Sequence, residues 1–372
     1  MPIYTNNNGI WKEIDTSHVN VRGVLKEIET IFGNVDGAWK EIWTLAKDTF
    51  IITPALTRAE IQEVLDISVN GAYLIFEVGD YYFDNGLIIK HSNTYLKGKI
   101  GTRIFCDYAN GNPIIGTVTT KIHNIGLSGL YIDGQVSSGK SCAGIMIDNV
   151  SSPTLASEDT GGYTAYRMGV NTLTNNNIGV TIRDCHIRNT FGIGVIIRRT
   201  SNSLVENVSV RNGSMAFSIV NTCTNITIEN CKMQMSRASA MKIGFSYRIT
   251  LNNCFIGNNE GGVTIEESTH CQLMNNKFTT NLSENIRVYN SRANIISGND
   301  IRQSSSAKGI YVDGNSKGNN IVSNIIRDCI YGIQNLNTAT YNYYCGNLLK
   351  SNSTQISVTG TGVINNYNRS TT

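Results

Sequence analysis

Apolar and polar residues in the second half of the chain repeat with a period of 23 residues. The segments VTIRDCHI, SLVENVSV, ITIENCKM, ITLNNCFI, QLMNNKF and IISGNDI align without gaps, and each carries Asp or Asn at the same point. This polar file runs at 23-residue intervals, slips by two at Asn324 and returns to 23 at Asn347; before the slip it consists of Asp184, Asn207, Asn230, Asn253, Asn276 and Asn299. A fixed period of this length is typical of a solenoid.

A second, apolar file lies half a period away. It runs through Ile196, Ile219, Ile243, Ile265, Val288 and Val312, with Phe217, Met241, Val263, Ile286 and Ile310 two residues before the later members. Alternation of apolar and polar residues predicts short strands, two or three in each unit, between Gly and Asn turns. We therefore expect an all-β, single-stranded parallel β-helix of about 23 residues per rung, with the apolar files inside and the asparagines stacked at one corner.

A short capping helix is predicted before the coil. The segment TRAEIQEVLDISVNG (57–71) places Ile61, Val64, Leu65 and Ile67 at helical spacing, and Thr57 and Glu60 form a capping-box pattern. Such a helix would cover the open edge of the first rung.

The helix and the strands that follow it, AYLIFEVGDYYFDNGLIIKHSNTYLKGKIGTRIF (72–105), resemble the opening of the pectate-lyase-like β-helix superfamily. The resemblance covers roughly residues 54–372. It implies that the coil is right-handed.

Residues 1–48 follow a different period, because a Gly-x-x-Lys-Glu-Ile motif recurs every 14 residues from Gly9, Gly23 and Gly37. This spacing suits a strand and a turn, so we expect a small sheet that displays Trp11, Leu25 and Trp39 on one face. A helix at LKEIETIF (25–32) is the alternative. We divide the chain into an N-terminal module (1–50) and the β-helix (51–372).

Gly-x-Trp-Lys-Glu-Ile repeats ahead of a β-helix resemble the virion-anchoring ends of bacteriophage tail spikes and tail fibres. The resemblance implies a homotrimer on the phage tail, made in the host cytoplasm without Sec export. It implies that Trp11, Leu25 and Trp39 belong to the part that attaches to tail or baseplate proteins. The coil would bind bacterial surface polysaccharide and, in a depolymerase, cleave it.

Composition narrows the classes of function. Only 16% of the 372 residues are charged and the formal net charge is +3, so the overall electrostatic footprint of a nucleic-acid-binding protein is missing. No window is apolar enough to cross a membrane, and MPIYTNNNGI (1–10) lacks the features of a signal peptide. A secreted bacterial pectate-lyase relative is therefore disfavoured.

No metal site or cofactor is predicted. The five histidines show no ligand spacing, the nine cysteines include no CxxC pair, and Cys185, Cys231 and Cys254 suit a buried stack. The segment GQVSSGKS (134–141) matches a P-loop pattern, but CAGIMIDNV (142–150) follows it with strand alternation where a P-loop needs a helix. We interpret it as a turn.

One outward face of the coil has the chemistry of a glycan groove. Tyrosine stacks on sugar rings, and charged side chains hydrogen-bond to sugar hydroxyls. The candidate glycan-binding residues are Lys242, Arg287, Tyr289 and Tyr311. Glu266 and Asp313 lie two rungs apart, roughly 9–10 Å between backbones, which is compatible with the acid and base of an inverting glycosidase.

A group of charged residues and an interruption of the repeat are two further candidate sites. Glu206 and Glu229 occupy adjacent rungs, and Arg183 lies one rung below them. We interpret Arg183 and Glu206 as an exposed ion pair. The alternative is that the two glutamates form a carboxyl pair in which one pKa is raised. The segment 150–177 interrupts the period and bears Glu158, Asp159, Tyr163, Tyr166 and Arg167. It is a surface loop or a contact to substrate or a neighbouring subunit.

Three function classes stay open at this point. A depolymerase needs the carboxylate pair, or a Lys or Arg base for lyase chemistry, in a groove. A binding protein needs aromatic and polar contacts without that pair. A non-catalytic structural or decoration protein of the tail or baseplate needs neither.

Overall fold

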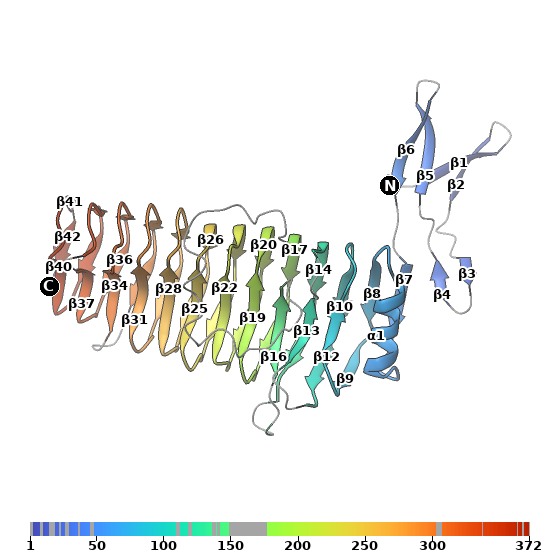
Figure 1. Cartoon of the computed structure of the whole chain (residues 1–372), viewed down its shortest axis with the longest axis horizontal. Helices are drawn as coiled ribbons and strands as arrows, with labels where there is room; N and C mark the ends of the chain where they lie inside the picture. Colours follow the sequence, from blue (N-terminus) through green and yellow to red (C-terminus); the bar gives the residue numbers. More distant parts are fainter. Residues whose placement is uncertain are drawn as a thin grey trace.

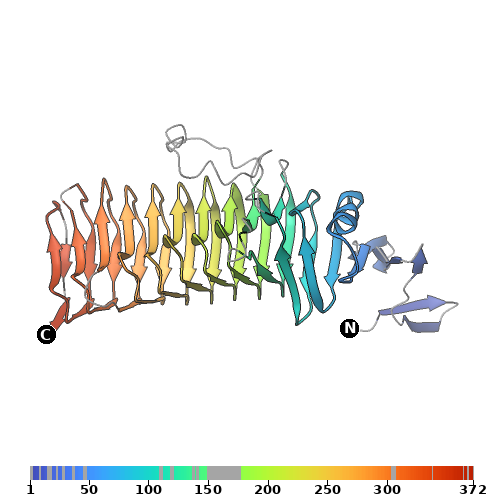
Figure 2. The ribbon, with the colours of Figure 1, turned by 90° about the horizontal axis from the view of Figure 1, so that it is seen from below.

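The computed structural model describes backbone and side chains of residues 49–108, 112–117, 121–135, 139, 142–148, 177–302, 307–336, 338–362, 364, 365 and 368–370. For the strands within residues 3–48, and for residues 366 and 371, it describes the backbone alone. From β7 onward, the described residues form a right-handed parallel β-solenoid of about 12 turns, as predicted. The rungs follow one another along one axis (Figures 1 and 2).

Each full rung contributes one strand to each of three parallel sheets, which we call the first, second and third sheet in chain order. The first sheet consists of β7 (Asp48–Ile52), β8 (Ala72–Phe76), β11 (Tyr95–Gly98), β14 (His123–Ser128), β17 (Asn177–Arg183), β20 (Thr200–Glu206), β23 (Thr224–Glu229), β26 (Tyr247–Asn252), β29 (Gln272–Met274), β32 (Ile295–Ser297), β35 (Asn320–Val322), β38 (Tyr343–Cys345) and β41 (Ile364–Asn366).

The second sheet consists of β9 (Gly79–Phe83), β12 (Thr102–Cys106), β15 (Tyr131–Asp133), β18 (His186–Arg188), β21 (Ser209–Arg211), β24 (Lys232–Gln234), β27 (Phe255–Gly257), β30 (Lys277–Thr279), β33 (Asp300–Arg302), β36 (Ile325–Arg327), β39 (Leu348–Lys350) and β42 (Arg369–Thr371). The third sheet consists of β10 (Leu87–Ile89), β13 (Pro113–Thr117), β16 (Ala143–Ile147), β19 (Ile193–Arg198), β22 (Met215–Val220), β25 (Ser239–Gly244), β28 (Gly261–Glu266), β31 (Glu284–Tyr289), β34 (Lys308–Asp313), β37 (Tyr331–Asn335) and β40 (Thr354–Val358).

The core lies inside the coil, where aliphatic side chains of successive rungs stack in files. Ile228 and Leu251 of the first sheet, for example, are register partners and fully buried. A fully buried side chain of this size contributes about 1.5–3 kcal/mol to stability. Within the described residues, no helix has the length and apolarity needed to cross a bilayer.

The predicted capping helix is confirmed as α1 (Arg58–Ile67), which begins at the capping box of Thr57 and Glu60. Ile61 and Leu65 are buried, whereas Ile67 is exposed. Gln62 donates to the carbonyl of Ile88 at 2.9 Å and accepts from its amide at 2.8 Å. The helix therefore satisfies backbone groups of β10, the edge strand of the third sheet.

One predicted register is wrong at Ile196. The inward partner of Ile219 is Ile197, and Ile196 pairs with Ser218 in the outward file. The reason is that this rung is one residue shorter than the average period. Ile196 is nevertheless buried, in a small apolar cluster with Met146 and Ile193 outside the coil's core.

The predicted asparagine file splits into two neighbouring files. Asp184, Asn207, Asn230 and Asn253 have positive φ at an exposed corner, where Asn207 donates to Asp184 and Asn253 donates to Asn230. Asn276, Asn299, Asn324 and Asn347 lie one position further along and are buried. In that buried file they continue the line of Cys185, Val208, Cys231 and Cys254, and the Cys254 amide donates to Asn276 Oδ1. The prediction that these cysteines are buried is confirmed.

The N-terminal residues form three antiparallel strand pairs: β1 (Ile3–Asn7) with β2 (Ile10–Ile14), β3 (Val19–Val21) with β4 (Val24–Lys26), and β5 (Thr30–Val35) with β6 (Ala38–Thr44). The helical alternative for residues 25–32 is wrong where the chain is described, because strands occupy both ends of that segment. Trp11, Leu25 and Trp39 lie in β2, β4 and β6, but their side chains lie outside the described part. The proposed division at residue 50 falls inside β7.

Candidate functional site

The predicted groove lies on the outer face of the third sheet. Strand pairing aligns Lys242, Thr264, Arg287 and Tyr311 in one outward file and Gly244, Glu266, Tyr289 and Asp313 in the next. Buried residues alternate with them on each strand, as β31 shows with Ile286 and Val288. The structure therefore brings the six candidate residues onto four neighbouring strands, β25, β28, β31 and β34.

Arg287 is at the centre of this face. Its Nη2 donates to Asp313 Oδ2 at 2.8 Å, and its guanidinium lies 5.1 Å from the ring centroid of Tyr289 and 5.8 Å from that of Tyr311. The hydrogen bond to Asp313 raises the pKa of Arg287. Partial burial is the main cause that raises the pKa of Tyr311, so its hydroxyl stays protonated at neutral pH.

A second cation lies close to Tyr311. Lys308 Nζ is 3.5 Å from the Tyr311 ring centroid and 3.5 Å from Glu284 Oε1. Cations near aromatic rings are attracted to the ring face. Two tyrosines and two cations are thus held in one layer on β31 and β34, which we call the Tyr–Arg platform (Arg287, Tyr289, Lys308 and Tyr311).

Both candidate catalytic carboxylates are held in ion pairs. Glu266 Oε2 lies 2.8 Å from Lys242 Nζ, and Asp313 pairs with Arg287. Asp313 is only 6% exposed, while Glu266 is half-buried. Acid–base chemistry by either carboxylate would require breaking its ion pair, whereas the paired donors and acceptors are suited to hydrogen bonds with neighbouring sugar hydroxyls.

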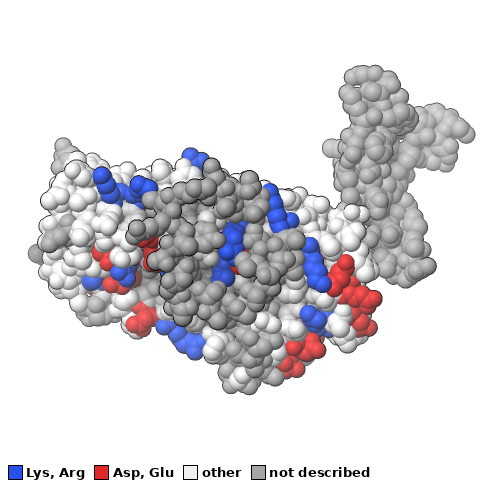
Figure 3. Space-filling view, in the orientation of Figure 1, with Lys and Arg blue, Asp and Glu red and all other residues white. Residues whose placement is uncertain are grey.

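Charged side chains are distributed unevenly over the surface (Figure 3). Basic side chains seen in the orientation of Figure 1 form several separate patches, and acidic side chains gather near α1 (Figure 3). At the start of the same face, Ser218 and Val220 pair with Lys242 and Gly244 in the outward files but are each only 2% exposed. The solvent-facing part of this face within the described residues therefore begins after β22.

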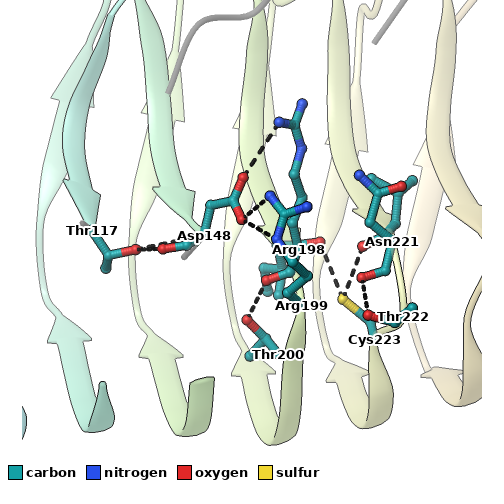
Figure 4. Close-up of polar contacts among 10 residues, drawn as sticks. Thr117, Asp148, Arg198, Arg199, Thr200, Asn221, Thr222 and Cys223 are labelled. Carbon is teal, nitrogen blue, oxygen red and sulfur yellow. Dashed lines mark hydrogen bonds and ion pairs between the residues drawn. The ribbon is translucent and has the colours of Figure 1, made fainter. Parts of the chain in front are cut away.

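A buried ionic cluster was missed by the sequence analysis. The Asp148 carboxylate, whose side chain is 2% exposed, lies 3.4 Å from Arg198 Nη1 and accepts from Arg199 Nε at 2.9 Å (Figure 4). Its backbone amide donates to Thr117 Oγ1 at 2.8 Å. The signal available was a pair of arginines at the end of the apolar strand β19, but their partner lies 50 or 51 residues away in the sequence, across the interruption of the repeat.

The structure also describes the Arg183–Glu206 pair and the strand after the P-loop-like segment. Arg183 Nε lies 2.9 Å from Glu206 Oε2 with both side chains partly exposed, which confirms the exposed ion pair. After the P-loop-like segment the chain forms β16, so the predicted strand is confirmed. Most of residues 134–141 and all of 150–176 lie outside the described residues.

A sequence profile of the NosD family, described as a periplasmic copper-binding protein, matches residues 178–372, just over half of the chain. The chain belongs to the NosD family. This match covers the regular rungs from β17 to the end of the coil, which include the Tyr–Arg platform. No curated protein matches the chain in sequence.

The copper in the NosD family's description does not fit the residues of this chain that the structure describes. Among them, no group of three or more His, Cys, Asp or Glu is close enough to hold a metal ion. Burial raises the pKa of the Cys223 and Cys271 thiols to about 12, whereas a metal-binding cysteine must be a thiolate. We therefore derive no metal chemistry from the family name.

Solved structures support the fold that the NosD match indicates. The A-module of an Azotobacter vinelandii mannuronan C-5 epimerase superposes with a TM-score of 0.61 at 15% identity, covering 85% of this chain and 96% of that one. A surface adhesin of Streptococcus pneumoniae gives 0.58 at 13% identity, with 86% and 91% covered. The ORF18 protein of Geobacillus virus E2 gives 0.55 at 14% identity, with 92% and 67% covered.

Proposed function

We propose that this protein binds a bacterial surface polysaccharide through the outer face of its third sheet. The observation that supports this most strongly is the Tyr–Arg platform, in which Tyr289 and Tyr311 flank the Arg287 guanidinium. Tyrosine rings provide surfaces on which sugar rings stack, and the Arg287–Asp313 pair offers a donor and an acceptor to adjacent hydroxyls. Ion pairing balances the charge of this face, which favours recognition through hydroxyls.

We further propose that the chain is the receptor-binding part of a phage tail spike or tail fibre. The repeats that contain Trp11, Leu25 and Trp39 support an attachment module, and a homotrimer and a virion location go with that role. Among structures with the same fold, one comes from a virus, one is an adhesin and one is named for acting on mannuronan. These names motivate the proposal for this chain through the shared fold alone.

The test is incubation of the full-length protein with capsular and lipopolysaccharide extracts from a panel of bacteria, following retention and the release of reducing or unsaturated ends. Retention without release is expected, since Glu266 and Asp313 are both ion-paired. Release of fragments would instead make the protein a depolymerase, with Asp313→Asn as the next variant. Absence of retention on every extract would contradict the proposal and favour a structural tail protein.

A pair of variants locates the binding face. Tyr289→Ala/Tyr311→Ala should lower affinity for the retained polysaccharide at least tenfold, because it removes the stacking surfaces. The matched control is Tyr73→Ala/Tyr95→Ala, which removes two neighbouring tyrosines of the first sheet whose ring centroids are 6.2 Å apart. Equal loss in both variants would contradict a site on the third sheet.

A further inference from the structure

The outer face of the second sheet carries a large excess of cations. In the second sheet, lysine or arginine occupies nine outward positions, from Arg103 of β12 to Arg369 of β42. Aspartate occupies three outward positions of the same sheet. The third sheet differs, since Lys242, Arg287 and Lys308 each have a carboxylate partner. The formal net charge of the whole chain is only +3, so the positive charge of this face is not apparent from the composition.

Four arginines of the second sheet are ion-paired, and five other cations are not. Arg103, Arg188, Arg302 and Arg327 lie within 4.0 Å of Asp80, Asp133, Asp328 and Asp300 respectively. Within the described part of the chain, no carboxylate lies within that distance of Arg211, Lys232, Lys277, Lys350 or Arg369. Their charges are therefore available to a ligand.

Three of these unpaired cations lie together in the middle of the coil. The five consecutive strands β18, β21, β24, β27 and β30 carry no acidic residue at an outward position, and Arg211, Lys232 and Lys277 are exposed on them. Phe255 lies between Lys232 and Lys277 in the same file. We call Arg188, Arg211, Lys232, Phe255 and Lys277 the basic tract, which is about 19 Å long at one rung spacing per strand.

Aromatic rings and a hollow border the tract. His186 stacks on Tyr131 with ring centroids 5.6 Å apart, and the Arg188 guanidinium lies 5.0 Å from the Tyr131 ring. A hollow of about 210 Å³ beside them is lined by residues that include His186, Ser209, Lys232 and the corner residue Asp184. Partial burial, followed by the charges of Arg188 and Lys232, lowers the pKa of His186, as expected at a positive surface.

We propose that the basic tract binds an extended acidic polysaccharide, at a site separate from the Tyr–Arg platform. The spacing of the charges favours this class over nucleic acid. The tract offers four cations on five rungs spaced by roughly 4.8 Å, and one of the four, Arg188, is paired with Asp133, whereas double-stranded DNA carries one charge per about 1.7 Å. A chain of sugars with about one carboxylate per ring matches the lower density, and Tyr131, His186 and Phe255 supply stacking surfaces.

The test uses two soluble polymers with the same backbone. Full-length protein is run through gels that contain carboxymethyl cellulose, which is anionic, or hydroxyethyl cellulose, which is neutral. We expect retardation by the anionic polymer alone, with a dissociation constant that rises steeply between low and high salt. Arg211→Gln/Lys232→Gln/Lys277→Gln should weaken this binding at least tenfold.

The matched control is Lys97→Gln/Lys99→Gln/Lys317→Gln, which removes the same charge from exposed lysines outside the second sheet and should bind like the unchanged protein. Circular dichroism establishes that both triple variants are folded. Equal loss in the two variants, or equal binding of both polymers, would overturn the proposal. Tighter binding of a single-stranded oligonucleotide than of carboxymethyl cellulose would also overturn it. Tyr289→Ala/Tyr311→Ala should leave the binding of carboxymethyl cellulose unchanged. The two proposed sites can therefore be contradicted independently of each other.

Discussion

At the scale of single residues, Asp148 is a charged side chain that is almost completely buried. Its carboxylate is buried between Arg198 and Arg199, and Arg198 is itself only 4% exposed. A buried cation that loses its partner is far more costly than an exposed one. The cluster therefore ties the residue after β16 to the end of β19 through side chains that do not recur in the repeat.

Asp148→Asn should lower the free energy of unfolding by about 3–5 kcal/mol, because it breaks the buried ion pair between Asp148 and Arg198. Chemical denaturation measures the change. Asp80→Asn, which breaks the partly exposed pair with Arg103, should cost at most about 1 kcal/mol. Similar costs for the two substitutions would contradict a special role for the buried cluster.

The buried asparagines should be equally sensitive. Asn299 accepts from the amide of Asn276, donates to the carbonyl of Leu273 at 2.9 Å and contacts Asn324. Asn299→Ala should cost at least about 2–3 kcal/mol, because buried backbone groups lose their partners. Asn320→Ala, at an exposed position of β35, should change stability by less than about 0.5 kcal/mol in the same denaturation experiment.

His186 reports the potential of the basic tract. Because burial and the neighbouring cations lower its pKa, the folded state disfavours the imidazolium, and this contribution reduces stability as pH falls through the ordinary histidine range near 6.5. Lys232→Gln should raise the pKa of His186 in an NMR titration, whereas Lys97→Gln should not. An unchanged pKa in the Lys232 variant would mean that the charge of Lys232 does not contribute to the shift.

At the scale of elements, α1 covers the edge of the third sheet through the hydrogen bonds of Gln62 as well as through its buried apolar residues. Gln62→Ala should increase amide hydrogen exchange at Ile88 and neighbouring residues of β10, since both backbone groups of Ile88 lose their partner. Glu63→Ala, on the exposed side of the same helix, should leave that exchange unchanged. Exchange that rises equally in both variants would point to general weakening of the helix.

The sequence predicted the strands and the helix well because each rung repeats the same burial pattern. It failed at Ile196 and at the step from Asn253 to Asn276, where a rung shorter by one residue moves a side chain to the neighbouring file. A period averaged over rungs cannot resolve such steps. The outward files of the candidate site were aligned correctly, but the ion pairs of Glu266 and Asp313 depend on rotamers that spacing does not specify.

At the scale of the whole molecule, the oligomeric state is the untested part of the proposed role. Sedimentation equilibrium of the full-length chain should give three times its 40.8 kDa mass if it is a tail-spike homotrimer. Trp11→Ala/Trp39→Ala should leave the circular dichroism of the coil unchanged, because the core of the rungs is formed by residues outside the N-terminal module. A monomer at all concentrations would contradict the trimer.

The buried asparagine file also gives the coil a direction. Along it, each amide donates toward the C-terminal neighbour, from Asn276 to Asn299, Asn324, Asn347 and Asn368. Peeling a rung from the C-terminal end strips a buried backbone amide and a side-chain amide of their shared acceptor. Peeling from the other side removes the carbonyl acceptor of one side-chain amide and leaves a side-chain oxygen without its donors, but every backbone amide of the file keeps its acceptor; buried N–H groups without a partner are rarer than buried oxygens without one. Under mechanical load this part of the coil should thus resist being unwound from its C-terminal end more than from its N-terminal side.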